Sequence, residues 1–195
     1  MENQPTNLMG LVLCGGGSSR MGSDKGLLRT VGDSAWVVRQ CRLLASCTVS
    51  MYVSLRSEQI ISYRRVVENV TFIPDSVNVK GPLNGLLSAH HNNKSEDFLA
   101  LACDMISINS NALINLISTY QTFPDADVYL YTKDDQMEPM CAIYTAKGLR
   151  KIDLMYMENR LRTFSIRSIV EELDCKRIQL QTEFNFKNYN SPTDL

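Results

Sequence analysis

Three consecutive glycines, Gly15 to Gly17, follow a short apolar run near the start of the chain, and two cations, Arg20 and Lys25, come soon after them. Glycine tolerates backbone conformations that other residues avoid, so peptide N–H groups in such a turn approach a ligand closely. Successive N–H groups form a concavity suited to phosphate oxygens. Arginine contacts phosphate through two donors, and lysine adds a point charge. This pattern predicts a binding site for a nucleoside polyphosphate.

The residue sequence of this glycine loop excludes two common phosphate-binding motifs. The dinucleotide-binding pattern G-x-G-x-x-G needs a glycine where the chain has Arg20. Gly17 and Gly22 have the spacing of a Walker loop, but Ser23 stands in place of its lysine. An ordinary glycine-rich turn between a strand and a helix is the remaining alternative.

Two aspartates follow predicted strands further along the chain. Asp75 ends one short apolar segment, and Asp104 ends the most continuous apolar run, 98–103. Mg²⁺ prefers oxygen ligands and commonly links one or two carboxylates to substrate phosphates, so Asp104 is the predicted metal ligand. The alternative is a helix-capping aspartate, a role that Ser107 or Ser110 could fill instead.

Alternating apolar periodicities predict an α/β fold, a Rossmann-like three-layer sandwich with a mostly parallel sheet and one antiparallel strand. Strands are expected at 8–13, 49–54, 70–73, 98–103, 127–131, 140–144 and 177–180, and helices at 34–45, from 82 onward, around 113–120, at 146–158 and at 164–173. Asp33 is the expected cap of the first helix, and strand 140–144 is expected to be antiparallel or at an edge. The chain is expected to form one domain, 1–195, with a flexible tail over 1–7.

Ligands in open α/β sheets bind at the carboxyl ends of the parallel strands. The loop 15–25, the segment 54–56, Asp75 and Asp104 all follow the ends of expected strands. We therefore expect these residues to gather along one rim of the sheet.

Composition excludes several other classes of function. Twenty basic and twenty-one acidic residues give a net charge of −1, which argues against a nucleic-acid or anionic-membrane partner. No apolar run approaches the roughly 18 residues that span a bilayer, and the polar start of the chain lacks the cationic beginning of a secretory signal. The six cysteines contain no C-x-x-C pair and indicate reduced thiols in a cytoplasmic protein.

The glycine loop also resembles a known signature. Its residues 13–25 read L-x-G-G-x-S-x-R-M-G-x-x-K, which is similar to GT-A-like nucleotidyltransferases and in particular to the molybdenum cofactor guanylyltransferase family. The resemblance implies that this loop wraps the phosphates of the nucleotide and that Lys25 contacts them. The nucleotide-binding residues implied for the loop are Leu13, Cys14, Gly15, Gly16 and Lys25, with Cys14 in place of the usual alanine.

Two later segments resemble nucleotide-binding parts of the same family. Asp104 stands where a C-D-x-P sequence coordinates the metal ion, although the proline is missing here. Asp75 and the later segment G-P-L-N-G-L are similar to a family pattern in which the aspartate, Gly81 and Pro82 meet the nucleotide. Ser54 and its neighbour Arg56 fall where the family contacts the guanosine portion, with serine replacing a more usual asparagine.

The second half of the chain resembles the part of the family that binds the second substrate. Residues 138–144 are similar to its E-P-x-x-A-x-Y strand, and 186–195 to its terminal F-x-N-x-N-T-P-E-D-L. The resemblance implies that Asn188 and Asn190 contact a pterin. Arg162, together with Arg160 and Arg167, is expected to supply cations for an anionic partner, with a solvated basic face as the alternative.

The resemblance implies transfer of GMP from GTP to molybdenum-bound molybdopterin with release of pyrophosphate. Mg²⁺ on Asp104 and the catalytic cations Lys25 and Arg20 would neutralise the triphosphate. Two alternatives stay open, a cytidylyltransferase acting on the same pterin and a non-catalytic nucleotide or cofactor carrier. Transient contacts with molybdenum-insertion and molybdoenzyme-maturation proteins are also expected.

Overall fold

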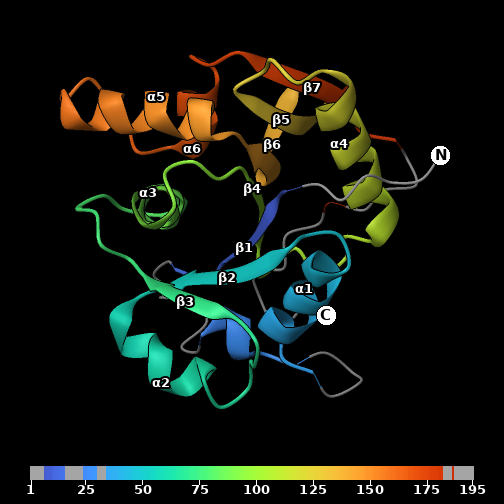
Figure 1. The fold of residues 1–195 in the computed structure, drawn as a ribbon, viewed down its shortest axis with the longest axis vertical. Helices are drawn as coiled ribbons and strands as arrows, with labels where there is room; N and C mark the ends of the chain where they lie inside the picture. The colour runs from blue at the N-terminus through green and yellow to red at the C-terminus, as the bar shows by residue number, and fades with distance from the viewer. Residues whose placement is uncertain (1–6, 16–23, 30–33, 182–185, 187–195) are drawn as a thin grey trace.

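The computed structural model describes residues 7–15, 24–29, 34–181 and 186. Its strands form one seven-stranded sheet in the order β3-β2-β1-β4-β6-β5-β7 (Figure 1). The strands are β1 (Met9–Leu13), β2 (Ser50–Leu55), β3 (Thr71–Pro74), β4 (Phe98–Ala102), β5 (Val128–Lys133), β6 (Gln136–Tyr144) and β7 (Cys175–Gln179). Strand β6 is antiparallel to both of its neighbours, and the other neighbouring pairs are parallel. The predicted α/β class with one antiparallel strand is confirmed.

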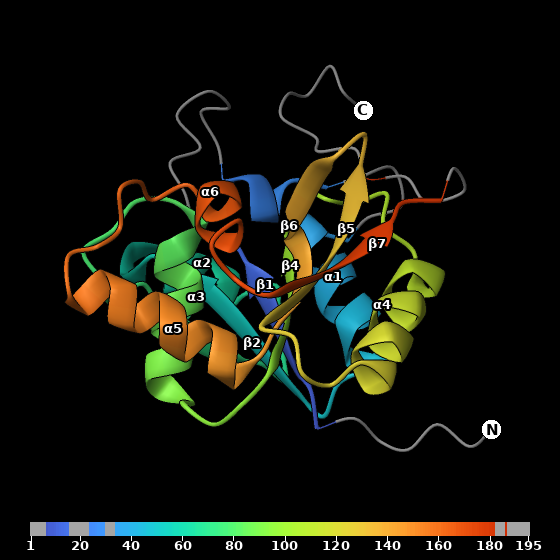
Figure 2. The same ribbon diagram turned by 90° about the horizontal axis from the view of Figure 1, so that it is seen from above.

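Helices cover both faces of this sheet. They are α1 (Trp36–Ala45), α2 (Ile60–Tyr63), α3 (Pro82–Asn92), α4 (Ser110–Thr122), α5 (Ala146–Met157) and α6 (Ile166–Val170), with short 3-10 turns η1 (Lys25–Leu27) and η2 (Ser57–Gln59). Figure 2 shows α1 and α4 on one side of the sheet and α3 and α5 on the other. Among the described helices, none is both long and apolar enough to cross a bilayer.

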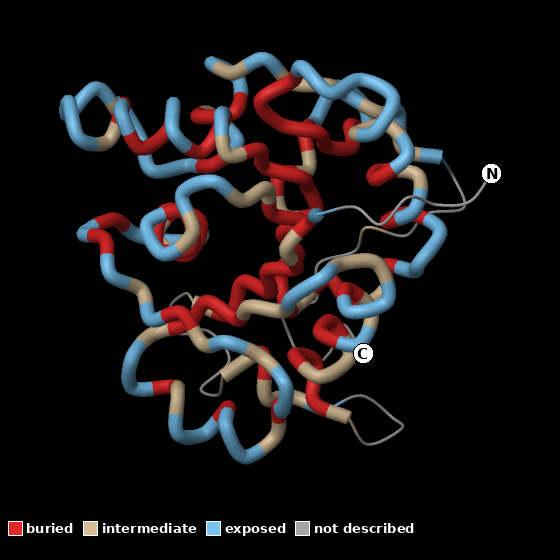
Figure 3. Tube along the Cα trace, viewed as in Figure 1, coloured by how far each residue is buried: buried red, intermediate tan, exposed pale blue. Residues whose placement is uncertain are grey.

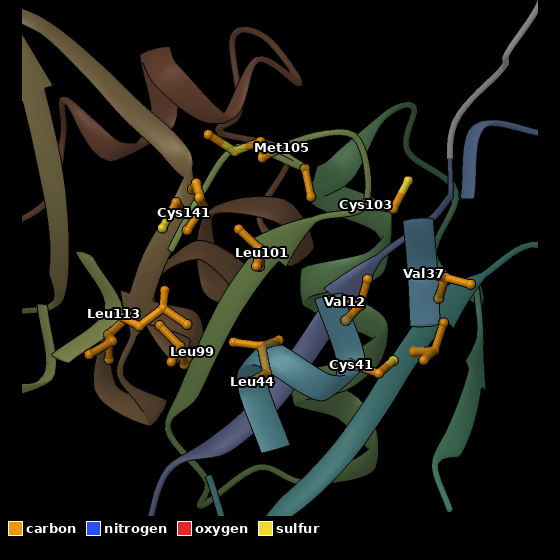
Figure 4. Packing of buried hydrophobic residues seen from close by; sticks show 14 of the residues in the cluster. Val12, Val37, Cys41, Leu44, Leu99, Leu101, Cys103, Met105, Leu113 and Cys141 are labelled. Carbon is orange, nitrogen blue, oxygen red and sulfur yellow. The ribbon is translucent and has the colours of Figure 1, made fainter. Parts of the chain in front are cut away.

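Two buried apolar clusters hold the three layers together, one on each face of the sheet. On the α1 and α4 face, Leu44 and Leu113 pack over Val12, Leu101 and Cys141 from three strands (Figure 4). The buried stretches follow the strands and the helix sides that face them (Figure 3). This two-sided burial explains why the central strands read as continuous apolar runs in the sequence.

Two of the long helices begin with recognisable start signals. Gly81 precedes α3 with a positive φ of 77°, and Pro82 occupies the first turn, where its missing N–H costs nothing. The side chain of Asn109 caps α4 by accepting a hydrogen bond from the Ala112 N–H at 3.0 Å. Because Asn109 fills this role, Asp104 does not cap α4.

Several boundaries differ from the sequence-based expectations. Strand β6 begins at Gln136 and lies inside the sheet, so the edge alternative for 140–144 is wrong. The helix expected at 164–173 is confined to α6 because the chain turns again before β7. The helical segment of η2 and α2 was not predicted. Helix α1 starts after Ala35, two residues beyond the expected cap Asp33, which lies outside the described residues, as do residues 1–6 of the expected tail.

Candidate active site

The carboxyl ends of β1, β2 and β4 lie level with one another. Leu13 pairs in register with both Ser54 and Ala102. Beyond that level, the Cys14 N–H donates to the Ser54 carbonyl at 2.8 Å, and the Cys103 N–H donates to the Leu13 carbonyl at 3.2 Å. The chain therefore leaves all three strands at the same rim, as the sequence predicts.

Lys25 and Asp104 meet at this rim. The Lys25 Nζ lies 2.9 Å from the Asp104 Oδ2, and the two side chains are 22% and 18% exposed. Lys25 is the first residue of η1, whereas Asp104 follows β4, so the fold joins two distant parts of the sequence. A partly shielded cation next to an anion at a strand end is suited to a ligand that carries both phosphates and a divalent metal.

Asp75 forms the second polar group of the rim. Its N–H donates to the Leu55 carbonyl at 2.9 Å, and its Oδ1 accepts a hydrogen bond from the Ser54 Oγ at 3.0 Å. Ser54 is fully buried, so its hydroxyl is held in one position. Its hydrogen bond therefore orients the Asp75 carboxylate. Burial raises the Asp75 pKa above its ordinary value, and the Ser54 hydrogen bond and the charge of Arg56 partly oppose that rise.

Gly15 lies directly against this carboxylate. A Cβ placed on Gly15 would lie 2.6 Å from the Asp75 Oδ2. Only glycine fits at this position with Asp75 in place. Gly15 is therefore packed closely against Asp75.

The start of α3 borders the same region. The side-chain amide of Asn84 donates to the Val77 carbonyl at 2.7 Å and to the Val79 carbonyl at 3.2 Å, while its oxygen accepts from the Val77 N–H at 3.1 Å. These bonds fix the loop that leads to Gly81 and Pro82. Gly81 itself is exposed and Pro82 is half-buried, so the backbone at the start of α3 is open to a ligand.

A cavity of about 330 Å³ lies beside β5 and β6. It is lined by Tyr131, Thr132, Lys133, Asp134, Gln136, Met137, Glu138, Arg167, Leu180 and Phe186. Lys133 and Arg167 bring two cations to it, and the Phe186 ring packs edge-on against Tyr131 with centroids 4.9 Å apart. Arg167 is a cation predicted from the sequence, whereas the sequence does not reveal that Lys133 and Phe186 line the same cavity.

Glu138 links this cavity to the rim. Burial raises the pKa of its carboxyl group, and the negative charge of Asp104 raises it further, against the Met140 N–H and Arg167, which lower it. Strand β6 runs antiparallel beside β4 with Cys141 opposite Leu101, so Glu138 and Asp104 lie toward the same end of the sheet. Hard oxygen donors of this kind fit Mg²⁺, which takes its remaining ligands from phosphates and water.

The described residues contain no group of three or more His, Cys, Asp or Glu side chains arranged to hold a metal ion. A metal at Asp104 would take further ligands from phosphates and water. The six cysteines are free thiols, as predicted, and burial raises the pKa of Cys41 to about 12. Thiolates are soft ligands, whereas Mg²⁺ prefers oxygen, so the carboxylates are the better candidates for this metal.

Some predicted site residues lie elsewhere or cannot be placed. Arg20, Gly16, Asn188 and Asn190 fall outside the described residues. Arg162 is exposed between α5 and α6 and does not line the cavity beside β5 and β6. Arg160, also exposed, pairs with Glu158 at 2.6 Å.

Comparison with known proteins agrees with this geometry. Residues 10–174 match the model of the MobA-like NTP transferase domain. The chain belongs to this family. The match spans the glycine turn, Lys25, Asp75 and Asp104, so the rim described above lies within the MobA-like domain.

Similar proteins cover nearly the whole chain. A probable molybdenum cofactor guanylyltransferase of Methanothermobacter thermautotrophicus is 29% identical over 188 residues, which cover 94% of this chain and 95% of the relative. A molybdenum cofactor biosynthesis bifunctional protein of Synechocystis is 31% identical over 193 residues, or 97% of this chain and 53% of the relative. The crystal structure of molybdopterin-guanine dinucleotide biosynthesis protein A from Archaeoglobus fulgidus superposes with a TM-score of 0.77 at 18% identity, covering 96% of this chain and 94% of that one, and shares its fold.

Proposed function

We propose that this MobA-like chain transfers GMP from GTP to molybdenum-bound molybdopterin and releases pyrophosphate. The observation that carries the proposal is the pairing of Lys25 with Asp104 beside the glycine turn. The pair provides a cation for phosphates and a carboxylate for a metal at the rim where α/β sheets bind ligands. The names of the relatives, several of them probable molybdenum cofactor guanylyltransferases, support the choice of substrates.

The nucleotide would lie across β1, with its base toward α3. Backbone groups of Leu13, Cys14, Gly15 and Gly16 would line the phosphates and sugar. Asp75, which accepts a hydrogen bond from Ser54, would also accept hydrogen bonds from the nucleoside. Exposed backbone at Gly81 and Pro82 would meet the base.

Asp104 would hold Mg²⁺ between the protein and the triphosphate. When bound, Mg²⁺ supplies positive charge that offsets the charge of the transferring group. Lys25 does the same from the protein side, and Arg20 is proposed to join it. Reactions of this class depend mainly on positioning and electrostatics, and losing one such contact costs about 3 kcal/mol of barrier.

The chemical step is an in-line displacement. An oxygen of the terminal phosphate of molybdopterin attacks the α-phosphorus of GTP, and a new P–O bond forms. The bond from the α-phosphorus to the oxygen that bridges to the β-phosphorus breaks, and its electron pair leaves on pyrophosphate. Lys25 is placed to stabilise this leaving charge, because its ammonium lies at the same rim as the proposed metal ligand.

The acceptor would occupy the cavity beside β5 and β6. Lys133 and Arg167 offer cations for its phosphate, and Phe186 offers an aromatic edge for a flat ring. Arg162, Asn188 and Asn190 remain proposed pterin contacts on the strength of the family resemblance. Transfer of the finished cofactor would bring transient contacts with molybdenum-insertion and molybdoenzyme-maturation proteins.

The test is a parallel turnover assay with GTP and CTP, using molybdenum-bound molybdopterin as acceptor and Mg²⁺ in excess. Pyrophosphate release with GTP but not with CTP supports the proposal, whereas release with CTP alone identifies a cytidylyltransferase. Binding of nucleotide without turnover of either identifies a carrier. Lys25→Ala and Asp104→Ala should remain folded and lose pyrophosphate release, and unchanged turnover in both would contradict the mechanism.

A further inference from the structure

Asp24, the residue before Lys25, is held by three hydrogen bonds. Its Oδ1 accepts from the Tyr63 hydroxyl at 2.6 Å and from the Gly26 N–H at 3.2 Å, and its Oδ2 accepts from the Gln59 side-chain amide at 2.5 Å. Two of these donors, Gln59 in η2 and Tyr63 in α2, are 35 and 39 residues away in the sequence. Bonds to an ionised carboxylate are stronger than those between neutral groups.

Tyr63 and Gln59 are themselves fixed. Tyr63 is fully buried in the cluster on the α1 and α4 face, and Gln59 is 6% exposed. The Gln59 side-chain oxygen accepts from the Arg56 N–H at 2.7 Å, which ties it to the end of β2. Burial raises the pKa of Tyr63, and neighbouring Cys14, Cys103 and Asp24 raise it further, so the hydroxyl stays protonated and remains a donor.

The turn that carries Lys25 has no room to shift toward Tyr63. A Cβ placed on Gly26 would lie within the contact distance of the Tyr63 hydroxyl, at 2.2 Å. The backbone on both sides of Lys25 is therefore fixed by the same tyrosine, through Asp24 before it and through close packing at Gly26 after it. The Lys25 ammonium reaches Asp104 from this fixed turn.

We propose that Tyr63 and Gln59 are positioning residues for Lys25, which they hold in reach of the nucleotide phosphates by fixing the carboxylate of Asp24. Tyr63 is a neighbour of Cys14, and Gln59 accepts from the Arg56 N–H, but neither belongs to the glycine loop or to the G-P-L-N-G-L segment. The assignment rests on the proposed function in so far as Lys25 contacts phosphates. Lys25 follows β1 and its partner Asp104 follows β4. The proposed role of Gln59, which is bonded to Arg56 just after β2, means that a third strand also helps to determine the position of the lysine.

The test compares two tyrosine-to-phenylalanine variants. Tyr63→Phe removes the hydroxyl that Asp24 accepts from. Tyr120→Phe is the matched control, because its hydroxyl donates to Asp97 Oδ2 at 2.7 Å just before the start of β4, at the opposite end of that strand. Both variants lose one tyrosine–aspartate bond, so both should lower the melting temperature by similar amounts.

Only Tyr63→Phe should weaken binding of Mg²⁺·GTP, by about tenfold or more, since hydrogen bonds to charged groups are the stronger class. In a Lys25→Ala background, Tyr63→Phe should cause no further loss, because the group that it positions is gone. Titration calorimetry with GTP, and with CTP in parallel, gives the dissociation constants. Gln59→Glu keeps the acceptor for the Arg56 N–H but loses the donor to Asp24, so it should act in the same direction if Tyr63→Phe does not fold.

The outcomes separate the two proposals. If the wild-type chain binds neither GTP nor CTP, the proposed function fails. If the wild type binds nucleotide while Tyr63→Phe and Gln59→Glu bind it equally well, the positioning role is wrong and the proposed function stands. An equal loss in the wild-type and Lys25→Ala backgrounds would also overturn it, because the effect would then not pass through Lys25.

Discussion

The Lys25 Nζ and the Asp104 Oδ2 are 2.9 Å apart although 79 positions separate the two residues in the sequence. In the proposed reaction each group binds a different part of the metal–nucleotide complex, yet without that complex they neutralise each other. A divalent cation that reaches Asp104 without a nucleotide is repelled by the positive charge of Lys25. A metal that arrives with a triphosphate brings new partners for the lysine, so metal and nucleotide should enter together.

The first prediction concerns binding of metal without nucleotide. Lys25→Met removes the charge at similar length, and it should raise the affinity for Mn²⁺ alone about two- to fivefold, since the pair is partly exposed. The same variant should bind Mg²⁺·GTP more weakly. Electron paramagnetic resonance of unbound Mn²⁺ measures the first effect. The control is Lys176→Met, whose ammonium lies over the Phe123 ring; an equal change there, or none in Lys25→Met, would contradict the idea.

A second prediction concerns the pH dependence of nucleotide binding. The Asp75 pKa is raised by burial, so the ionised carboxylate is lost on acidification at a higher pH than for an ordinary aspartate. Because the Ser54 hydrogen bond lowers that pKa, Ser54→Ala should move the acidic loss of GTP binding to still higher pH. Dissociation constants measured between pH 4 and pH 8 give the midpoint, which is the pH at which half of the GTP affinity is lost. Protonation of GTP itself affects every variant equally, so it cancels when variants are compared. Ser46→Ala, at an exposed serine, should leave the midpoint unchanged, and a Ser54→Ala profile identical to the wild type would remove Asp75 from the site.

The sequence was sufficient to predict the parts of the site that depend on strand ends. Asp75 follows β3 and Asp104 follows the fully buried β4, and parallel strands bring their carboxyl ends to one rim. Strand 140–144 was predicted to be antiparallel or at an edge, and the first of these alternatives is confirmed. These features can be predicted because each depends on residues that are only a few positions apart in the sequence.

The contacts that the sequence did not reveal join residues through tertiary packing. Tyr63 reaches Asp24 from a short helix whose pattern of polar and apolar residues is weak. Lys133 and Phe186 meet Arg167 in one cavity only after β5, β6 and the end of the chain are placed together. No local periodicity encodes such pairings, so the sequence alone does not distinguish Arg167, which lines the cavity, from Arg160 and Arg162, which do not.

A third prediction concerns stability in acid. Asp127 is fully buried, with Lys151 Nζ at 2.6 Å, Lys147 Nζ at 3.2 Å and the Asp174 N–H at 3.1 Å. Burial alone would raise its pKa, but these partners outweigh that effect and the pKa lies below its ordinary value. The ionised group therefore stabilises the fold above its unfolded-state pKa, and the stabilisation is lost as the pH falls through the lower folded-state value.

The test of this contribution is Asp127→Asn. At neutral pH the variant should lose about 2 kcal/mol of unfolding free energy, because a buried charged hydrogen-bond acceptor is removed while its two lysines stay half-exposed. The difference from the wild type should shrink as the pH approaches the folded-state pKa. Urea unfolding at several pH values measures it, with Asp125→Asn, at an exposed neighbour, as the control. A constant difference at all pH values would show that Asp127 acts through shape and not through charge.

The fourth prediction separates the acceptor site from the nucleotide site. Arg167 lines the cavity beside β5 and β6, where its Nη1 donates to the Gln136 Oε1 at 2.8 Å. Arg167→Ala should raise the KM for molybdopterin about tenfold, the loss of one charge-assisted contact to a phosphate, and leave the KM for GTP unchanged.

Substitutions at two other arginines serve as comparisons for Arg167→Ala. Arg160→Ala removes an exposed cation that already pairs with Glu158, so it should change neither KM. Arg162→Ala tests the choice that the family resemblance implies, since its side chain is exposed outside the cavity. A larger effect on the molybdopterin KM from Arg162→Ala than from Arg167→Ala would move the acceptor out of the cavity and toward the segment between α5 and α6. An effect of Arg167→Ala on GTP alone would place the nucleotide, and not the acceptor, against β6.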